Sequence, residues 1–218
     1  MTPPTALQAA LQDRLADAWL TAQRLPDSSV TLWLIDPTNM DRQFSPEETQ
    51  RLLEVPPYWC FCWASGQVLA HWLYSHTDWV RGKRVLDVGS GSGVVAIAAA
   101  LAGAEHVVAC DNDRLALDAC RANALLNGVQ LDCATDLADL QGHFDLVIAA
   151  DVLYDHANFP LLDQLTGHGR DVLVADSRVK DFAHPRYTRL ATFEGCTWPD
   201  LAEPEVFRQV SLYHARST

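Results

Sequence analysis

Residues 87–93 read Asp-Val-Gly-Ser-Gly-Ser-Gly and directly follow an apolar run. Glycine weakens helices and strands, so alternating glycines indicate a bend where the backbone must come close to something else. A P-loop for phosphate would need Gly-Lys-Ser/Thr, and no lysine follows Gly93. A dinucleotide fingerprint would need a glycine at position 94, where the chain has Val94. The bend therefore calls for another ligand.

The acidic residue that begins this segment suggests which ligand that is. Asp87 carries a negative charge that would repel a pyrophosphate but attract a cationic amino acid group. S-adenosylmethionine carries both an ammonium and a sulfonium group. We therefore predict S-adenosylmethionine as the cofactor, with Asp87 at the mouth of its site.

Two later acidic positions extend the same pattern. Asp111 and Asn112 follow the next apolar run, where an acidic side chain can hold both hydroxyls of a ribose. Asp136 and Leu137 follow the run after that, where the carboxylate could reach an adenine amino group while the leucine packs on the ring. Each feature alone is common in turns and helix caps. Their order at three successive strand ends predicts a nucleoside site.

The elements that position these residues alternate between strand and helix. We expect strands at 84–88, 106–111, 129–133, 144–150 and 171–175, and helices at 91–103, 113–127, 156–166 and 186–194. Continuous apolar strands separated by helices predict a Rossmann-like α/β fold, with a mostly parallel sheet and helices on both faces. Segments 196–199 and 205–215 predict a C-terminal antiparallel hairpin at the sheet edge.

The first 55 residues are expected to form an N-terminal extension, with the main domain at 56–218. Leucines spaced four apart and Trp19 predict an amphipathic helix over 5–24, and 30–35 predicts a strand. Ser45-Pro46 with Glu48 predicts a capped helix start. A further helix is expected over 65–76.

Composition limits the partners and the cellular compartment. The formal charge of −12 argues against nucleic acid and is compatible with a cationic protein surface. No apolar stretch is long enough for a transmembrane helix and no secretory signal is visible, so we expect a cytoplasmic protein and no membrane partner. Cys60 and Cys62 lack a second ligand pair, so no metal site is expected. The oligomeric state stays open.

Three segments resemble a known family. VLDVGSGSGVVAIAAA, VVACDND and FDLVIAADVLYD are similar to motifs of the class I, seven-β-strand, S-adenosylmethionine-dependent methyltransferases. The resemblance covers roughly residues 55–215, and it implies the strand order 3-2-1-4-5-7-6. An Asp-x-x-Tyr at 151–154 and an upstream Trp-Ala-Ser-Gly at 63–66 resemble the protein-lysine methyltransferases called family 16.

The resemblance also implies roles for individual residues. Asp151 and Tyr154 would face the substrate amine, with Asp151 orienting it and Tyr154 holding it or walling its channel. The residues expected to bind the cofactor are Trp63, Asp87, Gly89, Ser90, Gly91, Gly93, Asp111, Asn112, Asp136, Leu137 and Ala150.

The methyl acceptor is less well determined than the cofactor. Residues 56–73 and 82–104 are similar to family members that methylate lysines of the electron transfer flavoprotein β-subunit, which makes that subunit the expected partner. Ribosomal protein L11 and a small amine such as nicotinamide are alternative acceptors. A fold that binds partners without catalysis is a third alternative.

Overall fold

The computed structural model describes residues 2–40, 42–179, 183–200 and 202–217. Its central sheet is built from β3 (Arg84–Val88), β4 (His106–Cys110), β5 (Asp132–Ala134), β6 (Phe144–Ala150), β7 (Gly169–Asp176), β8 (Thr188–Glu194) and β9 (Gln209–Arg216). The helices are α1 (Thr5–Gln12), α2 (Pro46–Glu54), α3 (Ala64–Ser75), α4 (Val94–Leu101), α5 (Arg114–Leu126) and α6 (Leu161–His168). A separate hairpin joins β1 (Leu20–Arg24) and β2 (Thr31–Ile35).

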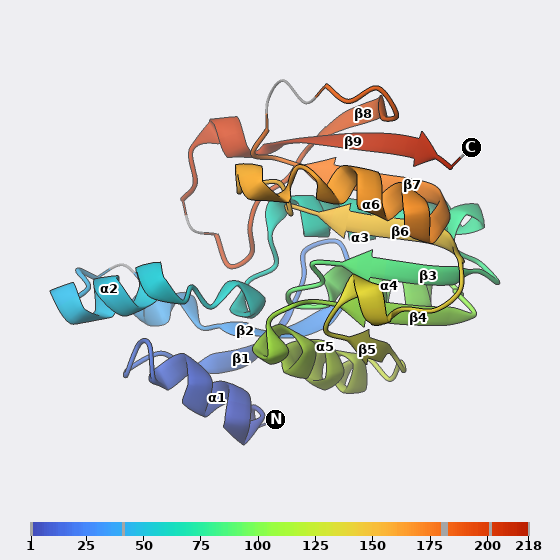
Figure 1. The fold of residues 1–218 in the computed structure, drawn as a ribbon. Coiled ribbons are helices and arrows are strands. Elements are labelled where there is room, and N and C mark those ends of the chain that lie inside the picture. The colour runs from blue at the N-terminus through green and yellow to red at the C-terminus, as the bar shows by residue number, and fades with distance from the viewer. Residues whose placement is uncertain (1, 41, 180–182, 201, 218) are drawn as a thin grey trace.

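The sheet has seven strands in the order β5-β4-β3-β6-β7-β9-β8 (Figure 1). Numbered within the sheet, this order is 3-2-1-4-5-7-6, which confirms the expected topology. Strands β3 to β7 pair in parallel, and only β9 runs antiparallel to its neighbours β7 and β8. The carboxyl ends of β3, β4 and β6 therefore lie together at one edge.

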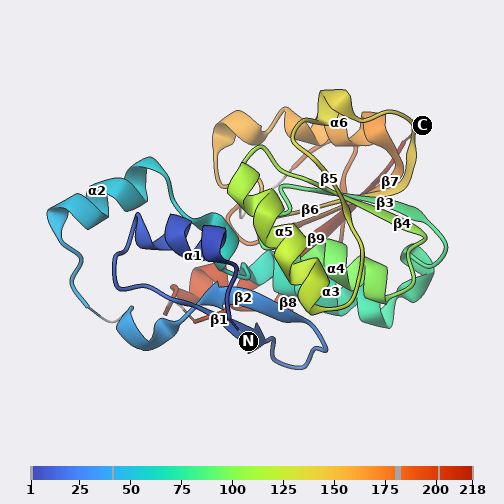
Figure 2. The same cartoon turned by 90° about the horizontal axis from the view of Figure 1, so that it is seen from below.

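Helices cover both faces of the sheet, as Figure 2 shows. Apolar residues of α3, α4 and α5 share one buried cluster with the sheet residues that point to that side. Leu162 and Leu165 of α6 are buried in a second cluster on the opposite face. The fold is thus a three-layer α/β arrangement that keeps the strand ends accessible.

The N-terminal hairpin is attached to α5 by two asparagines. Asn123, which is fully buried, accepts the Trp33 amide N–H at 2.7 Å, and Asn127 accepts the Thr31 amide N–H at 2.9 Å. The Asn123 side chain also donates to the Ser92 carbonyl at 2.8 Å. The N-terminal segment is therefore linked to the loop that contains the alternating glycines.

The expected helix over 5–24 is wrong beyond its first turns. Helix α1 ends at Gln12, and Leu20 begins a strand. The Gln8 side chain explains the reversal, because it accepts the Leu20 amide N–H at 2.8 Å and donates to the Ala18 carbonyl at 2.9 Å. These bonds hold the returning chain against α1, and β1 then pairs with β2.

The expected helix over 186–194 is also wrong, because Thr188–Glu194 is strand β8, paired with β9. Residues 196–199 contribute only an isolated bridge between Trp198 and Cys62, rather than a strand of the sheet. The local sequence of residues 188–194 also permits a helix, but pairing with β9 satisfies the backbone hydrogen-bonding groups of this segment as a strand. The helix start at Ser45 is confirmed, with both hydrogen bonds of the capping box present.

Candidate active site

A cavity of about 850 Å³ opens at the carboxyl edge of the sheet. Its lining residues come from the ends of β3, β4, β5 and β6, from the start of α6 and from the segment before α3. Eight residues predicted to bind the cofactor line it: Trp63, Gly89, Gly91, Asp111, Asn112, Asp136, Leu137 and Ala150. The cavity also contains both predicted catalytic residues, Asp151 and Tyr154.

Two glycines shape the wall formed by the β3–α4 loop. Gly89 has φ of 69°, and a Cβ atom there would lie 2.6 Å from Cγ1 of Val152. Gly91 has φ of 51°, and a Cβ atom there would approach no atom closer than the Gly89 carbonyl oxygen, at 4.0 Å. The missing side chain of Gly91 therefore leaves free space along the cavity wall, where a ligand can lie against the backbone.

Three predicted cofactor residues do not line the cavity. Asp87 is buried beneath the loop and accepts the Ala96 amide N–H of α4 at 3.1 Å. Ser90 is buried, with its hydroxyl 3.4 Å from the Cys110 carbonyl. Gly93 is the N-cap of α4 and packs on Cys120, which a Cβ atom would meet at 3.0 Å. These three residues support the loop, because its tight bend turns them toward the core.

Burial changes the charge expected for Asp87. The carboxyl group is taken out of water and Asp111 is a nearby like charge, so its pKa rises to about 7 despite the Ala96 amide. A buried carboxyl group that is only partly ionised near pH 7 is poorly suited to attract a cation in the way its position in the sequence indicated.

Asp111 occupies the position expected for a ribose ligand. Its Oδ2 accepts the Gly91 amide N–H and its Oδ1 accepts the Asp113 amide N–H, both at 2.9 Å. Burial raises its pKa from the ordinary value, and these two amides oppose that rise. Each carboxylate oxygen has a second acceptor site. Asp111 can therefore fix the glycine loop and still accept a hydroxyl from a ligand.

The next strand end provides a second polar and apolar pair. Asp136 is exposed, and its Oδ1 caps a 3₁₀ turn by accepting the Ala138 amide N–H at 2.9 Å. Leu137 is half-buried and lines the cavity beside it. This pairing leaves one oxygen of Asp136 for an exocyclic amine and an apolar surface for a ring.

Asp151 is held more firmly than the sequence indicated. Its carboxylate accepts the Ser65 amide and hydroxyl at 2.9 and 2.6 Å, and the Ser177 amide and hydroxyl at 3.1 and 2.8 Å. Its φ of 52° is rarely adopted by non-glycine residues. Asp151 thus clamps the start of α3 to the end of β7, an arrangement not expected for an amine-orienting group.

Aromatic side chains form another part of the cavity lining. The rings of Tyr58 and Tyr154 have centroids 5.4 Å apart, and those of Tyr58 and Trp63 are 5.7 Å apart. Arg178 lies over the Trp63 ring at 5.6 Å and forms an ion pair with Glu203. Sequence reasoning missed Tyr58, Arg178 and Glu203. Tyr58 lies within residues 56–73, the segment similar to lysine methyltransferases. Arg178 and Glu203 lie in later parts of the chain, where no site was expected.

The arrangement fits a nucleoside joined to an amino acid. Free space beside Gly91, a carboxylate at the second strand end and an apolar residue with a carboxylate at the third follow one another along the cavity. This order matches the amino acid, ribose and adenine of S-adenosylmethionine, and the lining residues that the structure describes include a single basic group, Arg178, rather than a cluster of the kind that recognises phosphates.

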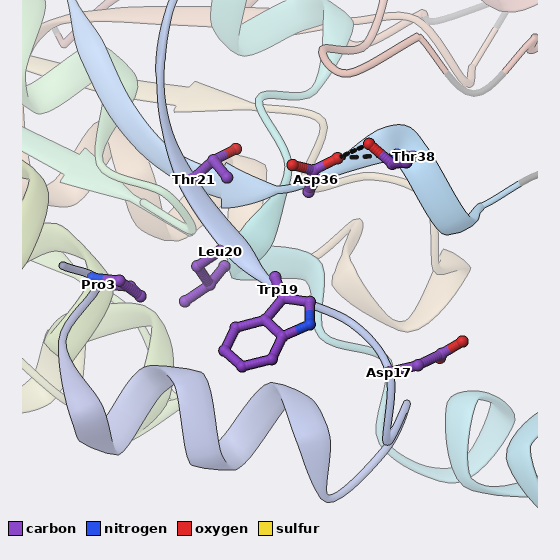
Figure 3. A pocket seen from close by; sticks show the side chains of 7 residues that line it. All are labelled: Pro3, Asp17, Trp19, Leu20, Thr21, Asp36 and Thr38. Atoms are coloured by element: carbon purple, nitrogen blue, oxygen red, sulfur yellow. Dashed lines mark hydrogen bonds between the residues drawn. The ribbon is translucent and has the colours of Figure 1, made fainter. Parts of the chain in front are cut away.

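A second hollow, of about 420 Å³, lies beside the N-terminal hairpin (Figure 3). Trp19 forms part of it and is 56% exposed. None of the predicted site residues lines this hollow.

The described ranges hold neither a metal-binding cluster nor a membrane-spanning helix. His, Cys, Asp and Glu side chains nowhere gather there in a group of three able to hold a metal ion. No helix in those ranges combines the length and apolarity needed to cross a lipid bilayer.

Comparison with known proteins gives the fold and the family. The model of the ribosomal protein L11 methyltransferase (PrmA) family matches residues 71–161. The solved L11 methylase of Lactobacillus delbrueckii is 26% identical, with a TM-score of 0.54 over 70% of this chain and 79% of that one. Magnesium protoporphyrin IX methyltransferase of Synechocystis, solved with bound S-adenosylmethionine, has a TM-score of 0.53 at 20% identity, over 82% and 86%. The chain has the fold of the class I S-adenosylmethionine-dependent methyltransferases and is similar to members of that class in sequence.

Within that class, the chain is similar to enzymes named for a protein substrate. The electron transfer flavoprotein β-subunit lysine methyltransferase of Rattus norvegicus is 43% identical over 102 residues, which are 45% of this chain and 40% of the relative. The protein of the same name from Xenopus laevis is 37% identical over 138 residues, or 59% and 56%. The chain thus spans about half the length of these curated relatives.

Proposed function

We propose that this protein is an S-adenosylmethionine-dependent N-methyltransferase that modifies a lysine side chain of a protein, and that its target is the electron transfer flavoprotein β-subunit. The observation that carries the proposal is the cavity in which Gly91, Asp111 and Leu137 follow one another at three strand ends. The similarity to lysine methyltransferases supports the protein substrate.

Different residues of the chain would contact different parts of the cofactor. Gly89 and Gly91 would lie against its amino acid part, Asp111 would accept ribose hydroxyls, and Asp136 with Leu137 would hold the adenine. When bound, S-adenosylmethionine supplies an electrophilic methyl group on sulfur. The protein then has to bring an amine in line with that methyl, and alignment of this kind is worth roughly 7–11 kcal/mol.

The acceptor amine must lose its proton before it can attack. A lysine has a pKa of about 10.4, so deprotonation at pH 7.5 costs about 4 kcal/mol. A sulfonium nearby lowers that pKa, and water can remove the proton. Asp151 supports the site by holding α3, β6 and β7 together through its hydrogen bonds to Ser65 and Ser177.

Ribosomal protein L11 is the second candidate substrate. The match of residues 71–161 to the L11 methyltransferase family and the 26% identity to a solved L11 methylase favour it. We also propose a cytoplasmic location, in keeping with the free thiols of its six cysteines.

The test is transfer from tritiated S-adenosylmethionine to purified acceptors. Electron transfer flavoprotein β-subunit, ribosomal protein L11 and nicotinamide would be offered in parallel, each with wild-type protein and with Gly91→Val. We expect label in the flavoprotein subunit and none with Gly91→Val, because a valine fills the space beside the loop. Label confined to L11 or nicotinamide would reassign the substrate. No transfer to any acceptor, despite cofactor binding, would favour a non-catalytic protein.

A further inference from the structure

Two tyrosines present exposed rings to the cavity. Tyr58 is 42% exposed and Tyr154 is 57% exposed, although both line the cavity wall. They come from segments far apart in the chain, yet their ring centroids are 5.4 Å apart and the planes are inclined at 51°. Large apolar surface left exposed within a cavity marks a place where a ligand can bind.

The surrounding residues hold Tyr58 in place beside Tyr154. Trp59, next to Tyr58, is almost completely buried, and the Trp63 indole N–H donates to the Tyr58 carbonyl at 3.0 Å. Trp63 packs edge-on against Tyr58. Within the part of the chain that the structure describes, neither tyrosine hydroxyl has a hydrogen-bond partner. The Tyr58 ring is thus preorganised beside Tyr154, while both hydroxyls stay available to a ligand.

The charges of the cavity select a cation. The lining residues that the structure describes include Asp111, Asp113, Asp136, Asp151 and Glu203 as acidic groups. Arg178 is the one basic group among them, and its guanidinium is paired with Glu203. A negative cavity attracts cations and excludes anionic acceptors.

Asp151 is poorly placed to provide the amine contact itself. Its Oδ1 accepts three of the four hydrogen bonds from Ser65 and Ser177 and its Oδ2 accepts the fourth, so the carboxylate is largely committed to these two serines. Tyr154 retains its phenolic proton at neutral pH, because burial raises its pKa. Neutral aromatic rings attract ammonium and methylammonium groups through their π faces.

We propose that Tyr58 and Tyr154 form a subsite for an alkylammonium group, which receives the acceptor lysine and retains its methylated forms because methylation preserves the positive charge. This inference rests on the proposed function, and it transfers the recognition of the amine from Asp151 to an aromatic pair. Tyr58 thereby becomes a substrate-binding residue that the sequence alone did not indicate.

The test compares the binding of a cationic probe with that of its uncharged isostere. The probes are N-acetyl-trimethyl-lysine amide and the analogue in which carbon replaces the quaternary nitrogen, titrated into the protein saturated with S-adenosylhomocysteine. We expect the cationic probe to bind at least threefold more tightly in wild type. Tyr58→Leu and Tyr154→Leu should each reduce that preference, while the conservative Phe variants should keep it. Tyr74→Leu is the matched control, because Tyr74 lies outside the cavity and bonds to Ser29.

Equal binding of the two probes to wild-type protein would overturn the subsite, and this comparison does not depend on whether any variant folds. A preference that survives in both leucine variants would also overturn it. Failure of the proposed function is distinguishable, because it would appear as absent binding of S-adenosylhomocysteine or absent methyl transfer, measured separately.

Discussion

At the scale of single residues, Asp111 combines a structural and a binding role. Its two backbone partners place it between the glycine loop and the start of α5. We expect Asp111→Ala to weaken binding of S-adenosylhomocysteine by about 1–3 kcal/mol, the scale of a charge-assisted hydrogen bond. Calorimetric titration measures this change. Asp132→Ala, an exposed carboxylate outside the cavity, is the control, and an equal affinity in both variants would remove Asp111 from the ribose site.

Asp151 separates two explanations of the Asp-x-x-Tyr segment. If it serves as a clamp, Asp151→Asn should lower the free energy of unfolding by about 1–3 kcal/mol, because one oxygen becomes an NH2 group that cannot accept and the remaining hydrogen bonds lose a charged acceptor. Urea denaturation measures this loss. If instead it orients the amine, stability should stay near normal while single-turnover methylation falls at least tenfold.

The clamp also predicts that its serines are energetically coupled to it. Ser65→Ala and Ser177→Ala should each cost about 0.5–1.5 kcal/mol in the wild-type background. In the Asp151→Asn background, either substitution should cost clearly less, because the partner has already been weakened. Costs that simply add would show that the serines act independently of Asp151.

At the scale of elements, the junction of β3 and α4 contains a pH-sensitive group. Asp87 has a folded-state pKa of about 7, whereas an unperturbed Asp has about 3.9. The folded protein therefore binds more protons than the unfolded chain between these values. Stability should fall as pH rises from about 4 to 7, and then level off.

Asp87→Asn should remove this contribution, because an amide oxygen can still accept the Ala96 N–H without a buried charge. We expect the drop in unfolding free energy between pH 5 and pH 8 to shrink by on the order of 2 kcal/mol. Urea titrations at both pH values provide the measurement. Asp176, whose pKa burial raises to about 6, contributes with the same sign but is present in both proteins. An unchanged pH dependence would mean that Asp87 stays ionised in the folded state.

At the scale of the whole molecule, the net charge of −12 should affect the encounter with a lysine-bearing protein. Salt screens attraction between exposed charges, with a Debye length of about 10 Å at 0.1 M. We expect KM for the acceptor protein to rise severalfold when NaCl is raised from about 50 to about 300 mM. The affinity for S-adenosylhomocysteine, measured under the same conditions, should change less. A KM independent of salt would exclude electrostatic steering of the substrate.

The sequence by itself determined the alternation of strands and helices, the glycine loop and the strand-end residues Asp111 and Leu137, whereas the order of the sheet was implied by the family resemblance. These features depend on local causes: apolar runs select strands, glycines permit a tight bend, and parallel strands must end at one edge. The helix start at Ser45 was predictable for the same reason, since a capping box involves only neighbouring residues.

Only the tertiary structure decided the rest. Residues 20–24 and 188–194 became strands because distant segments pair with them. Asp87 turned inward to α4, and Asp151 met Ser65 and Ser177, although neither serine is its neighbour in the chain. Arg178 and Glu203 reached the cavity from the far end of the sequence. Hydrogen-bond partners that are remote in sequence leave no periodic pattern, so these roles depend on how the folded chain brings the groups together.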